Sequence, residues 1–265
     1  MSNDLLVNLK NLTVTFPRHR DTVTAVDGLD LTIKRGETVG LIGESGSGKS
    51  VTARTILGLA GARASVTADT YEVTGQPGLT MNDRQWRTIR GKKIGMVLQD
   101  ALTSLDPLHT VGQEIAEALG AHGKVDNAEE KITQLLRSVG MPEPEERARQ
   151  YPHELSGGLR QRALIASAIA ASPDLLIADE PTTALDVSVL AQILDLLKAK
   201  VSGGMALLLV SHDLAVVSDV CDRVIVMKDG RIVEQGPTQL VLTNPREEYT
   251  KLLLAAVPSA QTRGY

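Results

Sequence analysis

A glycine-rich segment near residue 45 has the residue types and spacing of a phosphate-binding loop. It matches the pattern GxxxxGK[ST] and lies between a short apolar run, residues 39–42, and a helix-forming segment that begins at Lys49. Glycines let successive backbone N–H groups point inward, and the helix start adds partial positive charge. The lysine would reach the β and γ phosphates of a nucleotide, and the serine after it would bind Mg²⁺. The predicted nucleotide contacts are Gly43, Glu44, Ser45, Gly46, Ser47, Gly48, Lys49 and Ser50.

Two carboxylates at the end of another apolar run could supply the metal ligand and the base. Asp179 and Glu180 directly follow residues 175–178, LLIA. Because neighbouring side chains on a strand point to opposite faces, the two carboxylates should have different roles. Asp179 would hold Mg²⁺, and Glu180 would polarise an attacking water. Such a pair alone is ordinarily a solvated strand end, but beside a phosphate loop it predicts nucleotide hydrolysis.

The apolar pattern indicates the elements that must position these residues. Residues 5–16 and 29–33 alternate between apolar and polar, which predicts an antiparallel start to the chain. Residues 60–151 are mostly helical in pattern, with the clearest helix ending at Gly140 and a connector at 141–146.

After residue 173, strand and helix patterns alternate, which is typical of a parallel sheet covered by helices. The expected strands are 94–98, 175–178, 206–210 and 224–227, and the expected helices are 187–200 and 214–222. Asp229 and Gly230 predict a hairpin, and a closing helix follows residue 245. We therefore expect an α/β fold: a P-loop NTPase core with a mixed, mainly parallel sheet, an N-terminal antiparallel β subdomain and an inserted helical subdomain.

Composition excludes several other classes of protein. The 265 residues are 42% hydrophobic and 23% charged, which is typical of a globular chain. Cys221 is the only cysteine, which excludes an intrachain disulfide framework and a four-cysteine zinc site, and fits a reducing cytoplasm. The longest apolar run, residues 163–171, is too short to span a membrane. A net charge of −4 and six aromatic residues do not favour nucleic-acid binding.

Residues 155–162, LSGGLRQR, resemble the signature motif of the ATP-binding subunits of ABC transporters. Ser156 and the amides of Gly157 and Gly158, at the start of a helix, would form a second anion cradle. In that family the cradle closes on the γ-phosphate bound to another subunit. The resemblance therefore implies ATP hydrolysis at two sites that form only when two such domains meet.

Further matches follow in the family's order and cover nearly the whole chain. Gln99 resembles the Q-loop glutamine, which senses magnesium and the attacking water, and Asp186 resembles the D-loop aspartate, which faces the partner subunit. His212 resembles the switch histidine that contacts the γ-phosphate. Phe16 stands where the family has an aromatic residue that stacks on adenine, although its alternation with Leu12 equally suits a packed face.

The resemblance implies one nucleotide-binding domain over residues 1–265. Its predicted parts are an ATPase core with the β subdomain at 1–98 and 173–245, a mainly helical subdomain at 99–172, and a C-terminal helix and tail at 246–265.

Several segments more closely resemble the peptide and nickel importer branch. They are residues 95–100 (GMVLQD), 102–107 (LTSLDP), 183–187 (TALDV) and 249–253 (YTKLL). Leu98, where the branch usually has an aromatic residue, and Leu159, where methionine is common, depart from its pattern. This branch commonly pairs two different ATPase subunits, and residues 90–94 (RGKKI) resemble the first of them, so a heterodimer is expected.

The resemblance implies a peripheral subunit on the cytoplasmic face of the inner (plasma) membrane that uses ATP and Mg²⁺ to power import. Its implied partners are two transmembrane permease subunits, a second ATPase subunit and, indirectly, an extracytoplasmic substrate-binding protein. The permease is expected to dock on residues 99–120, and the cargo would be a peptide, nickel or a related small solute. The alternatives are a soluble ABC ATPase without a permease, a mainly regulatory ATP-binding subunit, and an exporter ATPase.

Overall fold

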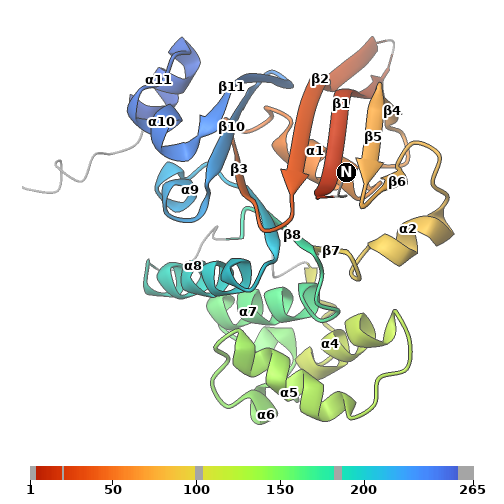
Figure 1. The fold of residues 1–265 in the computed structure, drawn as a ribbon. Helices are drawn as coiled ribbons and strands as arrows, with labels where there is room; N and C mark the ends of the chain where they lie inside the picture. The colour runs from red at the N-terminus through yellow and green to blue at the C-terminus, as the bar shows by residue number, and fades with distance from the viewer. Residues whose placement is uncertain (1–3, 20, 99–103, 182–186, 256–265) are drawn as a thin grey trace, which may run out of the picture. The chain divides into compact units, whose positions relative to one another are not determined.

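The computed structural model describes residues 4–19, 21–98, 104–181 and 187–255, which divide into two units (Figure 1). The first unit contains residues 1–80 and 208–265, the second contains 81–207, and the division falls inside β9 (Ala206–Val210). The other elements of the first unit are β1 (Leu5–Arg18), β2 (Asp21–Lys34), β3 (Thr38–Ile42), α1 (Lys49–Ile56), β4 (Ser65–Thr67), β5 (Thr70–Val73), β6 (Gln76–Pro77), α9 (Leu214–Val220), β10 (Arg223–Lys228), β11 (Arg231–Pro237), α10 (Thr238–Thr243) and α11 (Glu248–Ala255). Those of the second unit are α2 (Asp83–Ile89), β7 (Ile94–Val97), α4 (Val111–Gly120), α5 (Ala128–Ser138), α6 (Pro144–Arg147), the 3₁₀ helix η1 (Pro152–Glu154), α7 (Gly157–Ala168), β8 (Leu175–Asp179) and α8 (Val187–Ser202).

The first unit opens with an antiparallel sheet of order β2-β1-β5-β6, and β4 also pairs with β1. β1 and β2 pair from Leu5 opposite Lys34 to Arg18 opposite Asp21, with several register shifts between. Alternate apolar side chains of β1 are buried because a strand points every second side chain to the same face. This sheet confirms the expected N-terminal antiparallel subdomain.

The expectation of a mostly helical segment from residue 60 to 151 is wrong over residues 65–77, which form β4, β5 and β6. These strands are two to four residues long, so they show too little alternation for sequence to reveal them. The pairing of β4 and β5 with β1 is a long-range effect: Val73 lies opposite Val7, and Thr67 opposite Thr13, while β6 pairs with β5. The expected connector at 141–146 also contains the start of a short helix, α6, because Pro144 suits a first helical turn.

A second sheet in this unit carries the strand that precedes the glycine-rich loop. Within this unit its strand order is β11-β10-β3-β9, with β3 and β10 parallel and β10 and β11 joined as an antiparallel hairpin. Every residue of β3 and β9 is buried, as expected for strands covered on both faces. Parallel and antiparallel pairs in one sheet agree with the expected mixed α/β core.

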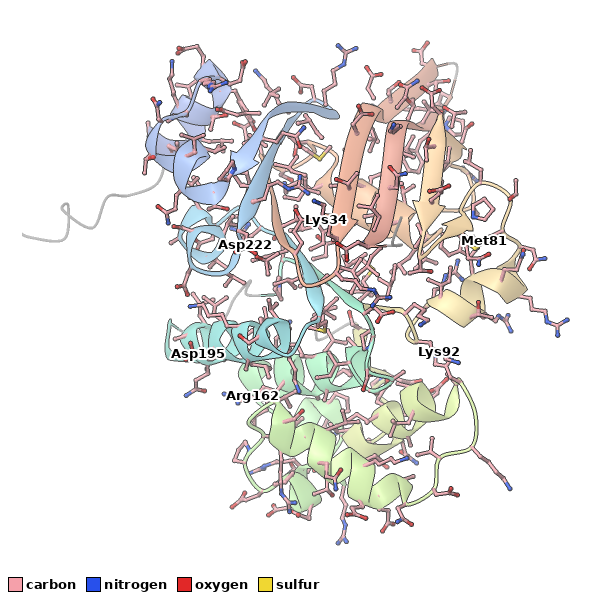
Figure 2. All side chains as sticks on the ribbon, viewed as in Figure 1. Lys34, Met81, Lys92, Arg162, Asp195 and Asp222 are labelled. Atoms are coloured by element: carbon pink, nitrogen blue, oxygen red, sulfur yellow. The ribbon has the colours of Figure 1, made fainter. Side chains whose placement is uncertain are left out.

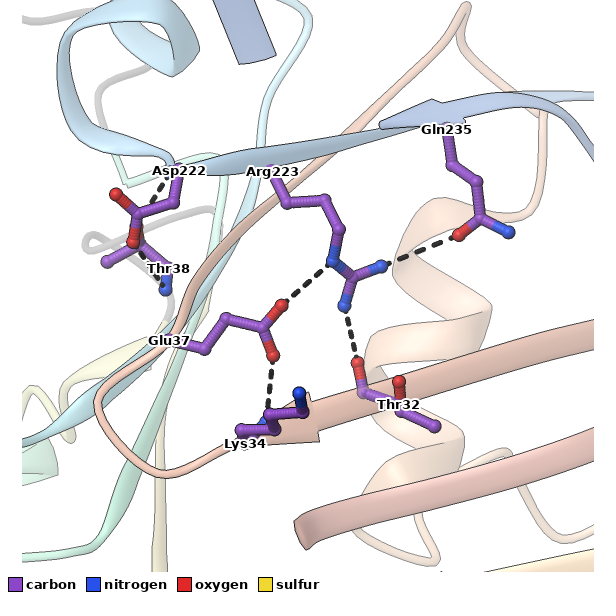
Figure 3. Close-up of polar contacts among 7 residues, drawn as sticks. All are labelled: Thr32, Lys34, Glu37, Thr38, Asp222, Arg223 and Gln235. Carbon is purple, nitrogen blue, oxygen red and sulfur yellow. Dashed lines mark hydrogen bonds and ion pairs between the residues drawn. The ribbon is translucent and has the colours of Figure 1, made fainter. Parts of the chain in front are cut away.

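Polar side chains hold the turn between β2 and β3 against β10 (Figure 3). Arg223 donates to the Glu37 carboxylate and to the Thr32 carbonyl oxygen, at 2.8 and 2.6 Å. The Thr38 hydroxyl donates to Asp222 at 2.6 Å, and the Asp222 N–H donates back to that hydroxyl at 2.8 Å. The Arg223 and Glu37 side chains are only 23% and 21% exposed, so solvent screens their ion pair in part.

We expect Arg223→Met to lower the free energy of unfolding by about 1–3 kcal/mol, because Glu37 and the Thr32 carbonyl lose a charged donor in a half-buried setting. Urea denaturation followed by circular dichroism measures the change. Lys34→Met is the matched control, because Lys34 donates to Glu37 through its backbone N–H, and this variant should stay within about 0.5 kcal/mol of wild type. Equal stability of Arg223→Met and wild type would show that the network adds nothing.

The second unit contains the helices that carry the signature segment. α4, α5 and α7 pack on one another, and Ile115, Ile132, Leu136 and Ile165 on these helices are buried. α5 confirms the clearest predicted helix and is followed by Gly140 at φ 69°. β7 and β8 pair in parallel, which confirms both predicted strands. No helix in the described part of the chain has the length and apolar character needed to cross a membrane.

Candidate active site

The glycine-rich loop follows β3 and ends where α1 begins, as the sequence predicts. Gly43 and Gly48 have φ of 151° and 102°, in the region that favours glycine. A Cβ atom on Gly43 would lie 2.2 Å from the carbonyl oxygen of Met227, and one on Gly48 would lie 2.4 Å from that of Ala25. Both backbone conformation and close packing therefore require glycine at these two positions.

This loop offers the groups that a polyphosphate needs. The first backbone N–H groups of α1 have no partner within the helix, and Gly48 at the N-cap has no side chain to cap them. The Ser47 hydroxyl oxygen is buried without a hydrogen bond among the described residues. Lys49, only 6% exposed, donates to the carbonyl oxygens of Gly43 and Glu44, both at 2.8 Å. A buried ammonium, an unsatisfied hydroxyl and a helix start together fit a bound phosphate chain.

His212 lies in the same unit as the loop, and the residues on both sides of it, Ser211 and Asp213, are held by hydrogen bonds. The Ser211 N–H donates to the Leu41 carbonyl at 3.2 Å, so β9 ends beside β3 just before the loop. The Asp213 carboxylate then caps α9 by accepting two N–H groups of its first turn, at 2.9 and 3.3 Å. The exposed His212 side chain therefore stands at the end of a strand next to β3, where the sequence places the switch histidine.

Phe16 is near the end of β1 and only half-buried, whereas Leu12 and Val14 on the same strand are fully buried. Its ring edge lies 3.8 Å from the place that a Cβ atom of Gly61 would take. Strand alternation thus does not carry Phe16 fully into the core. Adenine stacking by this ring stays a prediction.

In the second unit, β8 ends at Asp179, which is completely buried. Glu180 has φ 48°, an uncommon value for a residue with a Cβ atom that it shares with seven other described residues, so the backbone turns directly after the strand. Because Glu180 is no longer on the strand, the alternation argument does not determine the direction of its side chain. The sequence carries no signal for this backbone turn, and the base role of Glu180 stays a prediction.

The signature segment opens α7. Ser156 is the N-cap, and its hydroxyl oxygen accepts the N–H of Leu159 at 3.4 Å. Ser156 and Gly157 are exposed, whereas a Cβ atom on Gly158 would lie 2.6 Å from the Val189 side chain on α8. The segment is therefore an exposed helix start, which can bind an anion, and close packing on α8 requires the second glycine.

Arg162 on α7, labelled in Figure 2, has no role predicted from the sequence, but its contacts hold this helix in place. Its guanidinium donates to the carbonyl oxygens of Val139 and Gly140 at 2.9 and 2.7 Å, and to the Gln192 side chain on α8. Burial lowers the pKa of Arg162, but a guanidinium stays charged at neutral pH. The arginine thus ties the end of α5 and α8 to the helix that carries Ser156. The sequence of the motif does not indicate which backbone carbonyl oxygens this arginine will bind.

Two predicted site residues, Gln99 and Asp186, lie outside the described residues, and their roles stay predictions. The predicted magnesium ligands within the described ranges are Ser50, on α1 of the first unit, and Asp179, on β8 of the second. Their hydroxyl and carboxylate oxygens are ligands that Mg²⁺ prefers. Across the described ranges, no group of three or more His, Cys, Asp or Glu side chains could form a separate metal site.

Burial raises the pKa of Cys221 to about 12, so this thiol is not a nucleophile.

Comparisons with known proteins agree with these features. The sequence model of the ABC transporter family matches residues 26–183. A probable peptide ABC transporter ATP-binding protein of Sinorhizobium fredii is 47% identical over 259 residues, which cover 96% of this chain and 77% of the relative. The dipeptide transport ATP-binding protein DppD of Escherichia coli is 43% identical over 256 residues, covering 96% and 78%. A solved structure, the dimer of an ATP-binding cassette in a post-hydrolysis state with ADP and phosphate, superposes on this chain with a TM-score of 0.76. The two sequences are 31% identical, and the match covers 88% of this chain and 98% of the chain in that structure.

Proposed function

Because the chain belongs to the ABC transporter family, we propose that it is the ATP-hydrolysing subunit of an importer that carries peptides. One observation carries this proposal: the phosphate loop with its buried lysine occurs in a chain that is similar to peptide transporters over nearly its whole length. ATP-binding proteins named for peptide and dipeptide transport match 96% of this chain. The match extends beyond the ATPase motifs to nearly all of the chain. It therefore favours the peptide branch over ABC ATPases that work without a permease.

In the proposed reaction, water attacks the γ-phosphorus of ATP, and ADP leaves. The loop amides and the start of α1 hold the phosphates, and the Lys49 ammonium offsets their charge. Glu180 orients the water and accepts its proton, while His212 contacts the γ-phosphate. Magnesium, held by Ser50, Asp179 and Gln99, would neutralise further charge on the phosphates when bound. Positioning and charge stabilisation carry most of the rate in such reactions.

We propose that two ATPase subunits complete each other's sites. The exposed helix start at Ser156 and Gly157 supports this, because an anion-binding surface on the outside of a subunit suits a phosphate held by another subunit. Asp186 would face the partner at the same closure. The second ATPase subunit would have a different sequence, as is common in the peptide and nickel importer branch, so the assembly would be a heterodimer.

The proposed membrane partners are two transmembrane permease subunits, which this chain would bind on the cytoplasmic face of the membrane, with an extracytoplasmic binding protein that selects the peptide. Permease contact is proposed for residues 99–120, of which the structure describes 104–120. The loop before α4 is fixed by the Asp106 N–H, which donates to Glu114 at 2.7 Å, and by the Leu108 N–H, which donates to Asp106 at 2.9 Å. Within this loop the Leu105 side chain is buried, but the Leu108 side chain is 80% exposed. An exposed leucine on a rigid loop suits an apolar pocket of a partner.

Leu108→Asp should reduce the recovery of permease subunits with this chain by roughly tenfold or more, because a charge replaces an apolar anchor at an interface. The measurement is co-purification of the tagged chain from native membranes, with the attached proteins identified by mass spectrometry. Leu240→Asp is the matched control, since Leu240 is also exposed, at 49%, but lies on α10 in the other unit. Permease recovery equal in both variants and wild type would remove the loop from the interface.

The same experiment distinguishes the main alternative, a soluble ABC ATPase. Two multi-span permeases and a second ATPase with the wild-type chain would support the importer and the heterodimer. Recovery of the chain without any membrane protein would instead favour the soluble ATPase.

A further inference from the structure

The C-terminal helix α11 is anchored to β11 at its start. The Glu234 carboxylate accepts the backbone N–H groups of Arg246 and Glu247, at 2.8 and 3.3 Å, directly before the helix begins. Burial alone would raise the pKa of Glu234, but the Thr250 hydroxyl and these two backbone N–H groups together outweigh it and hold the pKa below its usual value. A carboxylate at this place also interacts favourably with the helix dipole. The position of α11 on the first unit is thus fixed by charge-assisted contacts.

This helix brings Tyr249 to the phosphate loop. The Tyr249 hydroxyl oxygen accepts the backbone N–H of Glu44 at 3.0 Å. The Lys228 ammonium, at the end of β10, lies 4.9 Å from the centroid of the tyrosine ring, which further fixes the ring. Burial raises the pKa of Tyr249, so its hydroxyl is neutral at physiological pH. Two independent contacts therefore hold this phenol in place against the loop.

The hydrogen bond from Glu44 acts on the same peptide bond as the loop lysine. The Glu44 N–H and the Gly43 carbonyl belong to one planar unit, whose two ends cannot rotate separately. Tyr249 holds the N–H end, and the Lys49 ammonium donates to the carbonyl end at 2.8 Å. Turning this plane would break both contacts. The tyrosine thus fixes the direction of the carbonyl that receives the Lys49 ammonium.

We propose that Tyr249 is a positioning residue for nucleotide binding, which acts through the peptide bond between Gly43 and Glu44 on the place of the Lys49 ammonium. The proposal rests on the proposed binding of ATP by this loop. Without the tyrosine hydroxyl, one of the two contacts that fix this peptide plane is lost. Part of the free energy of nucleotide binding is then needed to order the loop, so the affinity falls. Because coupling between two sites is reciprocal, nucleotide binding should in turn stabilise α11.

The test compares Tyr249→Phe with wild type in the full-length protein. Phenylalanine keeps the ring beneath Lys228 and removes only the hydroxyl. Calorimetric titration with a non-hydrolysable ATP analogue and Mg²⁺ should show a Kd about 3–10 times higher, the range expected for one lost hydrogen bond. In ATPase assays the KM for ATP should rise by a similar factor, while kcat changes less than about twofold. Leu252→Ala is the matched control on the same helix, because Leu252 is 68% exposed and its loss should leave the Kd unchanged.

Amide hydrogen exchange distinguishes this role from a merely structural one, because only coupling to the nucleotide would change the exchange rates in α11 when the analogue binds. In the wild type, the analogue should slow amide exchange in α11 and at Glu44, and in Tyr249→Phe this response of α11 should disappear. An unchanged Kd with a lower melting temperature would overturn the proposal, because Tyr249 would then only anchor the helix. Failure of the wild-type protein itself to bind the analogue would instead contradict the proposed function.

Discussion

Glu180→Gln is expected to slow ATP hydrolysis by about 10²–10⁴, or roughly 3–5 kcal/mol in activation free energy, while ATP stays bound. Glutamine keeps the size of the side chain and its ability to accept a hydrogen bond, but it cannot take a proton from the attacking water. The residue stands directly after the buried end of β8, where the backbone turns with φ 48°.

Release of phosphate under saturating ATP measures this effect, and the analogue titration checks that the nucleotide still binds. Glu146→Gln is the control, because Glu146 is an exposed glutamate in the same unit. Turnover of Glu180→Gln near that of wild type would remove Glu180 from the base role.

Lys49→Met is expected to weaken ATP binding by about 10²-fold or more. Methionine is nearly as long as lysine but has no ammonium, so the contacts to the charged phosphates are lost, and each such hydrogen bond contributes about 1.5–3 kcal/mol. The carbonyl oxygens of Gly43 and Glu44 also lose their donor, which loosens the loop before the nucleotide arrives.

Calorimetric titration with ATP and Mg²⁺ measures the affinity of this variant. Lys10→Met, an exposed lysine on β1, provides the control and should bind as wild type does. A Kd for Lys49→Met within threefold of wild type would show that the loop does not hold the phosphates as proposed.

The phosphate loop and the signature segment could be placed from the sequence because both depend on local rules. Gly43 and Gly48 require glycine for backbone reasons, and Ser156 is a helix N-cap of a preferred type, so their elements follow from neighbouring residues. The long strands β1 and β2 were predictable for a similar reason, since their alternation extends over many residues.

Other features depend on contacts that are distant in sequence. β4 and β5 are strands because β1 offers them an edge, β6 pairs in turn with β5, and this pairing is not visible in their few residues. The turn at Glu180 and the carbonyl partners of Arg162 depend in the same way on the packed structure. Tyr249 belongs to a C-terminal segment that resembles the importer branch, but its contact with Glu44 joins residues 205 positions apart, and no local pattern indicates it.

Transport by the reconstituted complex tests the central claim most directly. The chain would be co-purified with its membrane partners, placed in lipid vesicles and supplied with ATP, labelled dipeptide and the corresponding binding protein. The account predicts that dipeptide crosses the membrane only with hydrolysable ATP, and that Glu180→Gln abolishes this movement while the complex stays assembled. Dipeptide movement at the wild-type rate in the Glu180→Gln complex, or none in the wild-type complex while ATP is hydrolysed, would contradict it.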